Sequence, residues 1–200
     1  MNEVPTTTLK RLRTLTQIAA DLRQGKDYNI TRLTMLKSLC SDQNAAAQFA
    51  LYIAKKTQQA MKRPGRSESK TKQRYLRLVG SAVRRMTKHL KEGTTETKSS
   101  LDDVHSEIQS VQNKYECQRW GAVRIIKSME LLVVETALEC VLYPWASADL
   151  GYRLARQYAE RYDSRYGTGL IPESAPMVED IAEFWGKHFL GRGWRKRLAK

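Results

Sequence analysis

A helical repeat of apolar residues between positions 70 and 91 constrains the fold more than any other feature of the sequence. The repeat, which we call the seam, consists of Leu76, Val79, Val83, Met86 and Leu90. These positions step by three and four residues in turn, so an α-helix would place all of them on one face. The segment therefore predicts a long amphipathic helix.

A second face of the same predicted helix is basic. Its cations follow the same helical spacing, and together we call them the basic ridge: Lys70, Arg74, Arg77, Arg84, Lys88 and Lys91. Between Lys55 and Lys91 there are thirteen Lys and Arg residues and one acid, so this stretch carries +12 of the formal net charge of +14. The tail 192–200 carries a further +5, and the sequence pI is near 9.8. This asymmetry favours an anionic partner.

The rest of the chain also has helical periodicity, and no stretch shows the alternation that would predict a strand. A first helix is expected after Pro5, ending at Gly25, and a second is opened by Asn29 or Thr31. A third ends at Pro64-Gly65, because proline disfavours helix at the residue before it. One long helix is expected from about 100 to 143, capped by Ser99 or Ser100 and ended by Pro144, with Gly121 allowing a bend, and two more helices follow. The sequence predicts an all-α protein: an irregular bundle of six or seven helices around one long central helix.

Two polar segments bear on domain organisation. Residues 64–72 and 93–100 are rich in Ser, Thr and Gly and are expected to be linkers. The chain is treated as one helical domain over 1–200. An N-terminal helical subdomain 1–92, a C-terminal core 99–191 and a basic tail 192–200 remain an alternative division.

Several classes of protein are disfavoured. The three cysteines are widely spaced without a CxxC pair, which predicts neither a zinc site nor a disulfide framework and favours the cytoplasm. No apolar run fits a signal peptide or a membrane span. Nucleotide-binding and hydrolase motifs do not occur. The three histidines are far apart in sequence, and His105 with Asp102 is interpreted as a surface histidine beside a capping acid. We therefore expect no metal and no cofactor.

An acidic pair lies in the most apolar part of the chain. Glu135 and Glu139 are four residues apart and share a helix face. They could act as acid and base, since burial and like charge would raise the pKa of one of them. The favoured interpretation is structural, with the acids paired to Arg153, Arg156 or Arg124, because nothing else in the sequence supplies a nucleophile.

Tyrosines four residues apart form a further pattern at Tyr158, Tyr162 and Tyr166, with arginines between them. Such a stripe could stack on unpaired bases, but core packing is the favoured interpretation. Trp185 and Phe189 are also expected in the core. Trp194, in the basic tail after two glycines, is not.

The basic ridge is the best functional signal. The sequence predicts a non-enzymatic protein that binds nucleic acid, RNA ahead of DNA, mainly through phosphates, with steep salt dependence. The expected binding residues are Arg63, Arg66, Lys70, Arg74, Arg77, Arg84, Arg85, Lys88, Lys91, Arg195, Lys196 and Arg197, and Lys55 and Lys56 extend the charge. The alternatives are a helical adaptor that docks an acidic or apolar protein, a solvated helix face, an amphipathic helix on an anionic membrane and, least favoured, an enzyme that uses Glu135 and Glu139.

Overall fold

The computed structural model describes residues 4–26, 28–62, 70–116, 122–160, 169–170 and 172–199. Over these residues the protein is almost entirely helical, which confirms the all-α class. The α-helices are α1 (Thr6–Arg23), α2 (Leu36–Leu39), α3 (Gln43–Met61), α4 (Lys70–Glu92), α5 (Thr95–Glu116), α6 (Ala122–Leu142), α7 (Ser147–Ala159), α8 (Ala175–Leu190) and α9 (Trp194–Leu198). Short 3-10 turns are η1 (Ile30–Met35), η2 (Pro144–Ala146) and η4 (Pro172–Ser174).

One short antiparallel ladder was not expected. It joins β1 (Tyr28–Asn29) to β2 (Gly169–Leu170), with Tyr28 opposite Leu170. Strands of two residues are too short to show alternation, so periodicity could not have revealed them.

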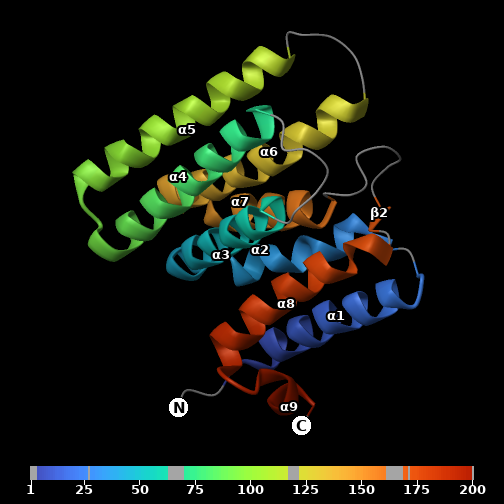
Figure 1. Cartoon of the computed structure of the whole chain (residues 1–200). Helices are drawn as coiled ribbons and strands as arrows, with labels where there is room; N and C mark the ends of the chain where they lie inside the picture. The colour runs from blue at the N-terminus through green and yellow to red at the C-terminus, as the bar shows by residue number, and fades with distance from the viewer. Residues whose placement is uncertain are drawn as a thin grey trace.

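The helices form three groups that follow one another across the molecule (Figure 1). At one end α4, α5 and α6 lie together, and at the other end α1 and α8 pack against each other with α9 beside them. Between the two groups, α3 packs against α4, α6, α7 and α8. The first and last helices of the chain, α1 and α9, pack against each other at the end away from α4.

The expected single helix from 100 to 143 is wrong. Its two halves are α5 and α6, and they lie side by side: His105 Nε2 is 3.9 Å from Glu139 Oε1. In one continuous helix these residues would be about 50 Å apart. Folding back buries the apolar face of α5, where Leu101, Val104 and Ile108 have no exposed surface. Residues 117–121, between the two helices, lie outside the described residues.

The N-terminus of α5 also differs from the prediction. The helix begins at Thr95, five residues before the expected start, and the Thr97 amide donates to Thr94 Oγ1 at 3.2 Å. Several Ser and Thr residues in this segment could cap a helix, so the sequence alone did not fix where the helix begins. The observed start at Thr95 buries Thr97, whose hydroxyl contacts His89 Nδ1 at 2.9 Å. Residues 70–72 of the other expected linker belong to α4, and 63–69 lie outside the described residues.

Pro144 ends α6 as expected, and the chain turns sharply into α7. Among the described residues, no single helix is long and apolar enough to cross a membrane. The stretches Met129–Leu142 and Pro144–Ala159 meet the length and hydropathy requirements only as a pair, which is bent by 110°.

Small side chains let α3 approach its four neighbours. Ala46, Ala50 and Ala54 have no exposed surface, and their small methyl side chains allow the neighbouring helices to pack close to the α3 backbone. Phe49 lies among aromatic rings of α8, with ring centroids 5.2 Å from Phe184 and 5.3 Å from Trp185. The expected core position of Trp185 is confirmed, and Phe189 is partly buried beside it.

The prediction that Trp194 lies outside the core is wrong. Its side chain is only 5% exposed and packs on Gly186, where an added Cβ would lie 2.3 Å from the indole. Arg13 Nε donates to the Leu198 carbonyl at 3.1 Å, which ties α9 to α1. The fit of Trp194 on Gly186 depends on how the chain turns between α8 and α9, and this turn has no helical periodicity that would predict the contact.

A matched pair of glycine substitutions tests how closely the helices pack, at the contact between Gly151 of α7 and Cys40. An added Cβ at Gly151 in α7 would lie 2.5 Å from Cys40 Sγ, so Gly151→Ala should lower the free energy of unfolding by about 1–3 kcal/mol. At Gly80 in α4 the added Cβ meets only the ends of the Gln58 and Arg84 side chains. Gly80→Ala should therefore leave the free energy of unfolding unchanged or raise it by about 0.5–1 kcal/mol. Urea denaturation measures both, and equal stability of the two variants would contradict the packing.

Candidate functional site

Helix α4 presents its two faces to different surroundings. Val79 and Met86 have no exposed surface and Val83 is 8% exposed, while Leu76 and Leu90 are half-buried against the same core. This face packs on α3, α5 and α6. The seam is therefore an internal contact of the bundle.

The basic ridge lies on the opposite side of α4 and is exposed along its whole length. Lys88 Nζ is 3.8 Å from Glu92, a long contact across one helical turn. Within the part of the chain that the structure describes, Arg74, Arg77 and Arg84 make no ion pair. A helix of 23 residues is about 34 Å long, so the ridge is an extended line of positive charge with few acids beside it.

Arg85 is next to the ridge in sequence but has a different environment. Its side chain is half-buried, and NH1 donates to the Ser100 carbonyl at 2.6 Å. The guanidinium therefore links α4 to the second turn of α5. Arg63 and Arg66, the other expected contributors beside the ridge, lie outside the described residues.

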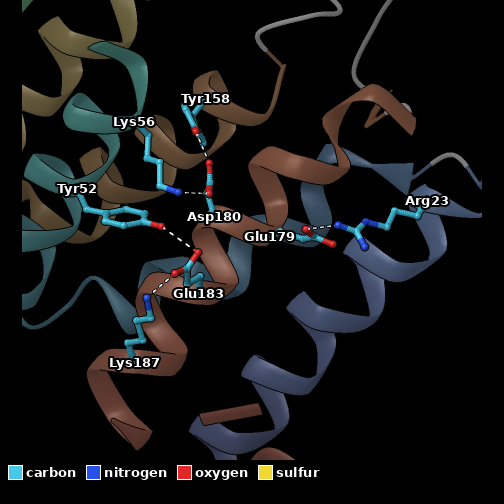
Figure 2. A network of polar contacts seen from close by, with 8 residues as sticks. All are labelled: Arg23, Tyr52, Lys56, Tyr158, Glu179, Asp180, Glu183 and Lys187. Atoms are coloured by element: carbon cyan, nitrogen blue, oxygen red, sulfur yellow. Dashed lines mark hydrogen bonds and ion pairs between the residues drawn. The ribbon is translucent and has the colours of Figure 1, made fainter. Parts of the chain in front are cut away.

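Lys56 does not extend the charge of the ridge, because its Nζ lies 2.6 Å from Asp180 Oδ1 in α8 (Figure 2). Burial opposes charge on this amine, but the hydrogen bond and negative charge of Asp180 outweigh it and raise the pKa of Lys56. Tyr158 donates to Asp180 Oδ2 at 2.7 Å and is 4% exposed, which confirms core packing for this tyrosine. Tyr162 and Tyr166 lie outside the described residues.

Two further acids of α8, Glu179 and Glu183, contact side chains of α1, of α3 and of α8 itself (Figure 2). Glu179 accepts from Arg23 at 2.5 Å, and Glu183 contacts both Tyr52 and Lys187. Burial and the charge of Asp180 raise the pKa of Tyr52 to about 12, so this phenol stays protonated near neutral pH. In these contacts each positive charge is paired with an acid of α8, so little uncompensated charge remains here for a ligand.

The basic tail is exposed but distant from the ridge. Arg195, Lys196 and Arg197 belong to α9, which packs on α8 and α1, whereas α4 packs on α3, α5 and α6. The two surfaces lie toward opposite ends of the molecule (Figure 1). Two tail arginines also make local contacts: Arg197 donates to the Leu190 carbonyl at 2.7 Å, and Arg195 lies over the Trp194 ring. The structure therefore does not join the predicted residues into one surface.

The fold brings together one cluster that sequence reasoning missed. His105 is 7% exposed, so its interpretation as a surface histidine is wrong. Its Nε2 lies 4.0 Å from Glu135 Oε1 and 3.9 Å from Glu139 Oε1. Arg153 NH1 is 3.5 Å from Glu139 Oε2, which is one of the expected structural pairings. The spacing of the two glutamates was visible in the sequence, but the histidine joins them only because α5 and α6 fold back on each other.

Comparisons with protein-family models, with curated proteins and with solved structures found no match for this chain. The chain's own residues define three candidate sites. Two are exposed, the basic ridge of α4 and the separate tail on α9, and the third is the buried cluster between α5 and α6.

Substitution of Asp180 tests the polar contacts of α8. Asp180→Ala would leave the half-buried Lys56 amine and the buried Tyr158 hydroxyl without this acceptor, so stability should fall by about 1–3 kcal/mol. Thermal or urea unfolding measures the loss. Glu173→Ala, at an exposed acid of η4, is the control and should change stability by less than about 0.5 kcal/mol. Equal effects of the two substitutions would show that the Asp180 contacts contribute nothing specific.

Proposed function

We propose that this protein binds nucleic acid non-enzymatically, through contacts between phosphates and the basic ridge of α4. One observation carries the proposal: the ridge is exposed along about 34 Å of a helix whose other face is fixed in the core. Its three arginines are unpaired among the described residues, so their charge is available to a ligand.

The spacing of the ridge suits a phosphate backbone. Successive cations are three, four or seven residues apart, so along most of the ridge a charge recurs about every 5 Å along the helix axis. Phosphates on one nucleic-acid strand recur about every 3.4 Å, a spacing that long and flexible Lys and Arg side chains can match. Such contacts release counterions and position the ligand, but they carry no sequence information. We therefore expect weak sequence preference.

We expect higher affinity for RNA than for DNA because of the arginines of the ridge. Arg74, Arg77 and Arg84 have planar guanidinium groups, which bind phosphate in a bidentate manner and also stack on exposed bases. Unpaired bases are the usual target of protein recognition in RNA, whereas duplex DNA keeps its bases stacked. Single-stranded RNA should accordingly bind more tightly than duplex DNA.

The structure argues against the membrane alternative. A helix that lies on an anionic membrane inserts its apolar face among the lipids. The apolar face of α4 is the seam, whose Val79 and Met86 are fully buried against α3, α5 and α6. Insertion would require α4 to leave the bundle, whereas phosphate binding requires no rearrangement.

A helical adaptor is the second candidate function. The seam is buried, so it does not offer a docking face. However, Trp145 is 81% exposed beside Tyr143, with ring centroids 6.4 Å apart. Exposed aromatic residues often carry the binding energy of protein interfaces. Trp145→Ala separates the two functions, because it should leave nucleic-acid binding unchanged and weaken an aromatic protein interface.

Charge reversal of the ridge tests the proposal. The variant combines Arg74→Glu, Arg77→Glu, Arg84→Glu and Lys88→Glu, and fluorescence anisotropy measures its affinity for single-stranded RNA, duplex RNA and duplex DNA. We expect wild-type binding near physiological salt and a loss of at least about 100-fold in the variant, because four of the six ridge cations become acids that repel phosphate.

The control reverses four exposed cations at the other end of the molecule: Lys10→Glu, Arg192→Glu, Arg195→Glu and Lys196→Glu. Both variants change the net charge equally, so a general charge effect would weaken both to the same extent. We expect the control to lose much less affinity than the ridge variant. A larger loss in the control would place binding on the tail, and absence of wild-type binding would contradict the proposal and favour an acidic protein partner.

A further inference from the structure

The cluster of His105, Glu135 and Glu139 places one carboxyl group in the core without the contacts that usually satisfy such a group. Glu135 is 7% exposed, and among the described residues its one polar contact is His105 Nε2 at 4.0 Å, which is beyond hydrogen-bonding distance. Buried carboxylates ordinarily have hydrogen bonds or a counter-charge, because an unpaired charge in the interior is very unfavourable. Glu135 has no such partner in the described structure.

Charge within the cluster is also unbalanced. Glu135 and Glu139 both direct an oxygen toward the same imidazole nitrogen. Arg153 lies 3.5 Å from the other oxygen of Glu139 and can balance one of the two negative charges. The negative charge of the other carboxylate has no Lys or Arg partner among the described residues.

The geometry of the cluster suits a metal ion. One nitrogen of His105 and one oxygen of each glutamate all lie within 4.8 Å of one another. Zinc binds nitrogen and carboxylate oxygen at about 2.0–2.2 Å, which places donor atoms about 3–3.5 Å apart. Small side-chain rotations close the difference. Metal sites in helical bundles are built in the same way, from donors on facing helices.

We propose that His105, Glu135 and Glu139 bind a divalent first-row transition-metal ion, with Zn²⁺ as the reference ion. One imidazole and two carboxylates suit Zn²⁺ or its neighbours in the series, whereas Mg²⁺ and Ca²⁺ prefer oxygen donors alone. Three protein donors leave a fourth position for water. The Gln109 side-chain amide, with Nε2 3.4 Å from His105 Nε2, lies on the nitrogen that the metal would bind, so it must turn aside when the metal enters.

A titration of the untagged, full-length protein with Zn²⁺ and Co²⁺ tests the site. We expect one equivalent of each metal to bind, with a rise in melting temperature and a Co²⁺ absorption spectrum of nitrogen and oxygen ligands. Glu135→Gln and His105→Gln should each weaken binding at least about tenfold, since each removes one of three donors. The matched controls Glu92→Gln and His188→Gln change exposed residues and should bind as wild type does.

Three results would overturn the proposal: no binding of either metal to the wild-type protein, unchanged binding by Glu135→Gln, or a thiolate-to-cobalt band that assigns the metal to cysteine. Circular dichroism shows whether each variant folds. If His105→Gln does not fold, the nearly isosteric Glu135→Gln and Glu139→Gln variants decide the question. Because metal binding is measured without nucleic acid, its result does not depend on whether the basic ridge binds nucleic acid.

Discussion

Burial of the α4 seam is the contact on which the rest of the arrangement depends. A fully buried Val or Met side chain contributes about 1.5–3 kcal/mol, whereas an exposed ion pair contributes at most about 1 kcal/mol. Val79 and Met86 therefore set the orientation of α4 against α3, α5 and α6, and the charged side chains follow. Because the seam faces inward, the basic ridge faces solvent as a continuous line.

The net charge of the protein is distributed unevenly between paired and unpaired cations. Lys56 and Arg23 are paired with acids of α8, and Lys37 lies 2.6 Å from Asp149. Such pairs add little stability at the surface, but they cancel the local positive potential. The ridge has few acids beside it, so it is the described part of the bundle where a phosphate chain meets the most uncompensated charge.

Local patterns predicted the helical class, the faces of α4, the end of α6 and a cap at Asn29 or Thr31, of which Asn29 forms the cap, because each depends on neighbouring residues. The errors concern contacts between different helices, which local patterns do not specify. Periodicity continues through 100–143 whether or not the chain folds back, so it could not separate α5 from α6. For the same reason, the burial of His105 beside Glu135 and the docking of Trp194 on Gly186 could not be predicted.

The most direct test of the ridge is the salt dependence of RNA affinity for the wild-type protein and for single variants. Each of Arg74→Gln, Arg77→Gln and Arg84→Gln removes one phosphate contact in this account. The slope of log K against log salt concentration should therefore become shallower by about 0.7 for each variant on single-stranded RNA. The control Arg192→Gln should keep the wild-type slope. Unchanged slopes in all three ridge variants, or an equal change in the control, would contradict the central claim.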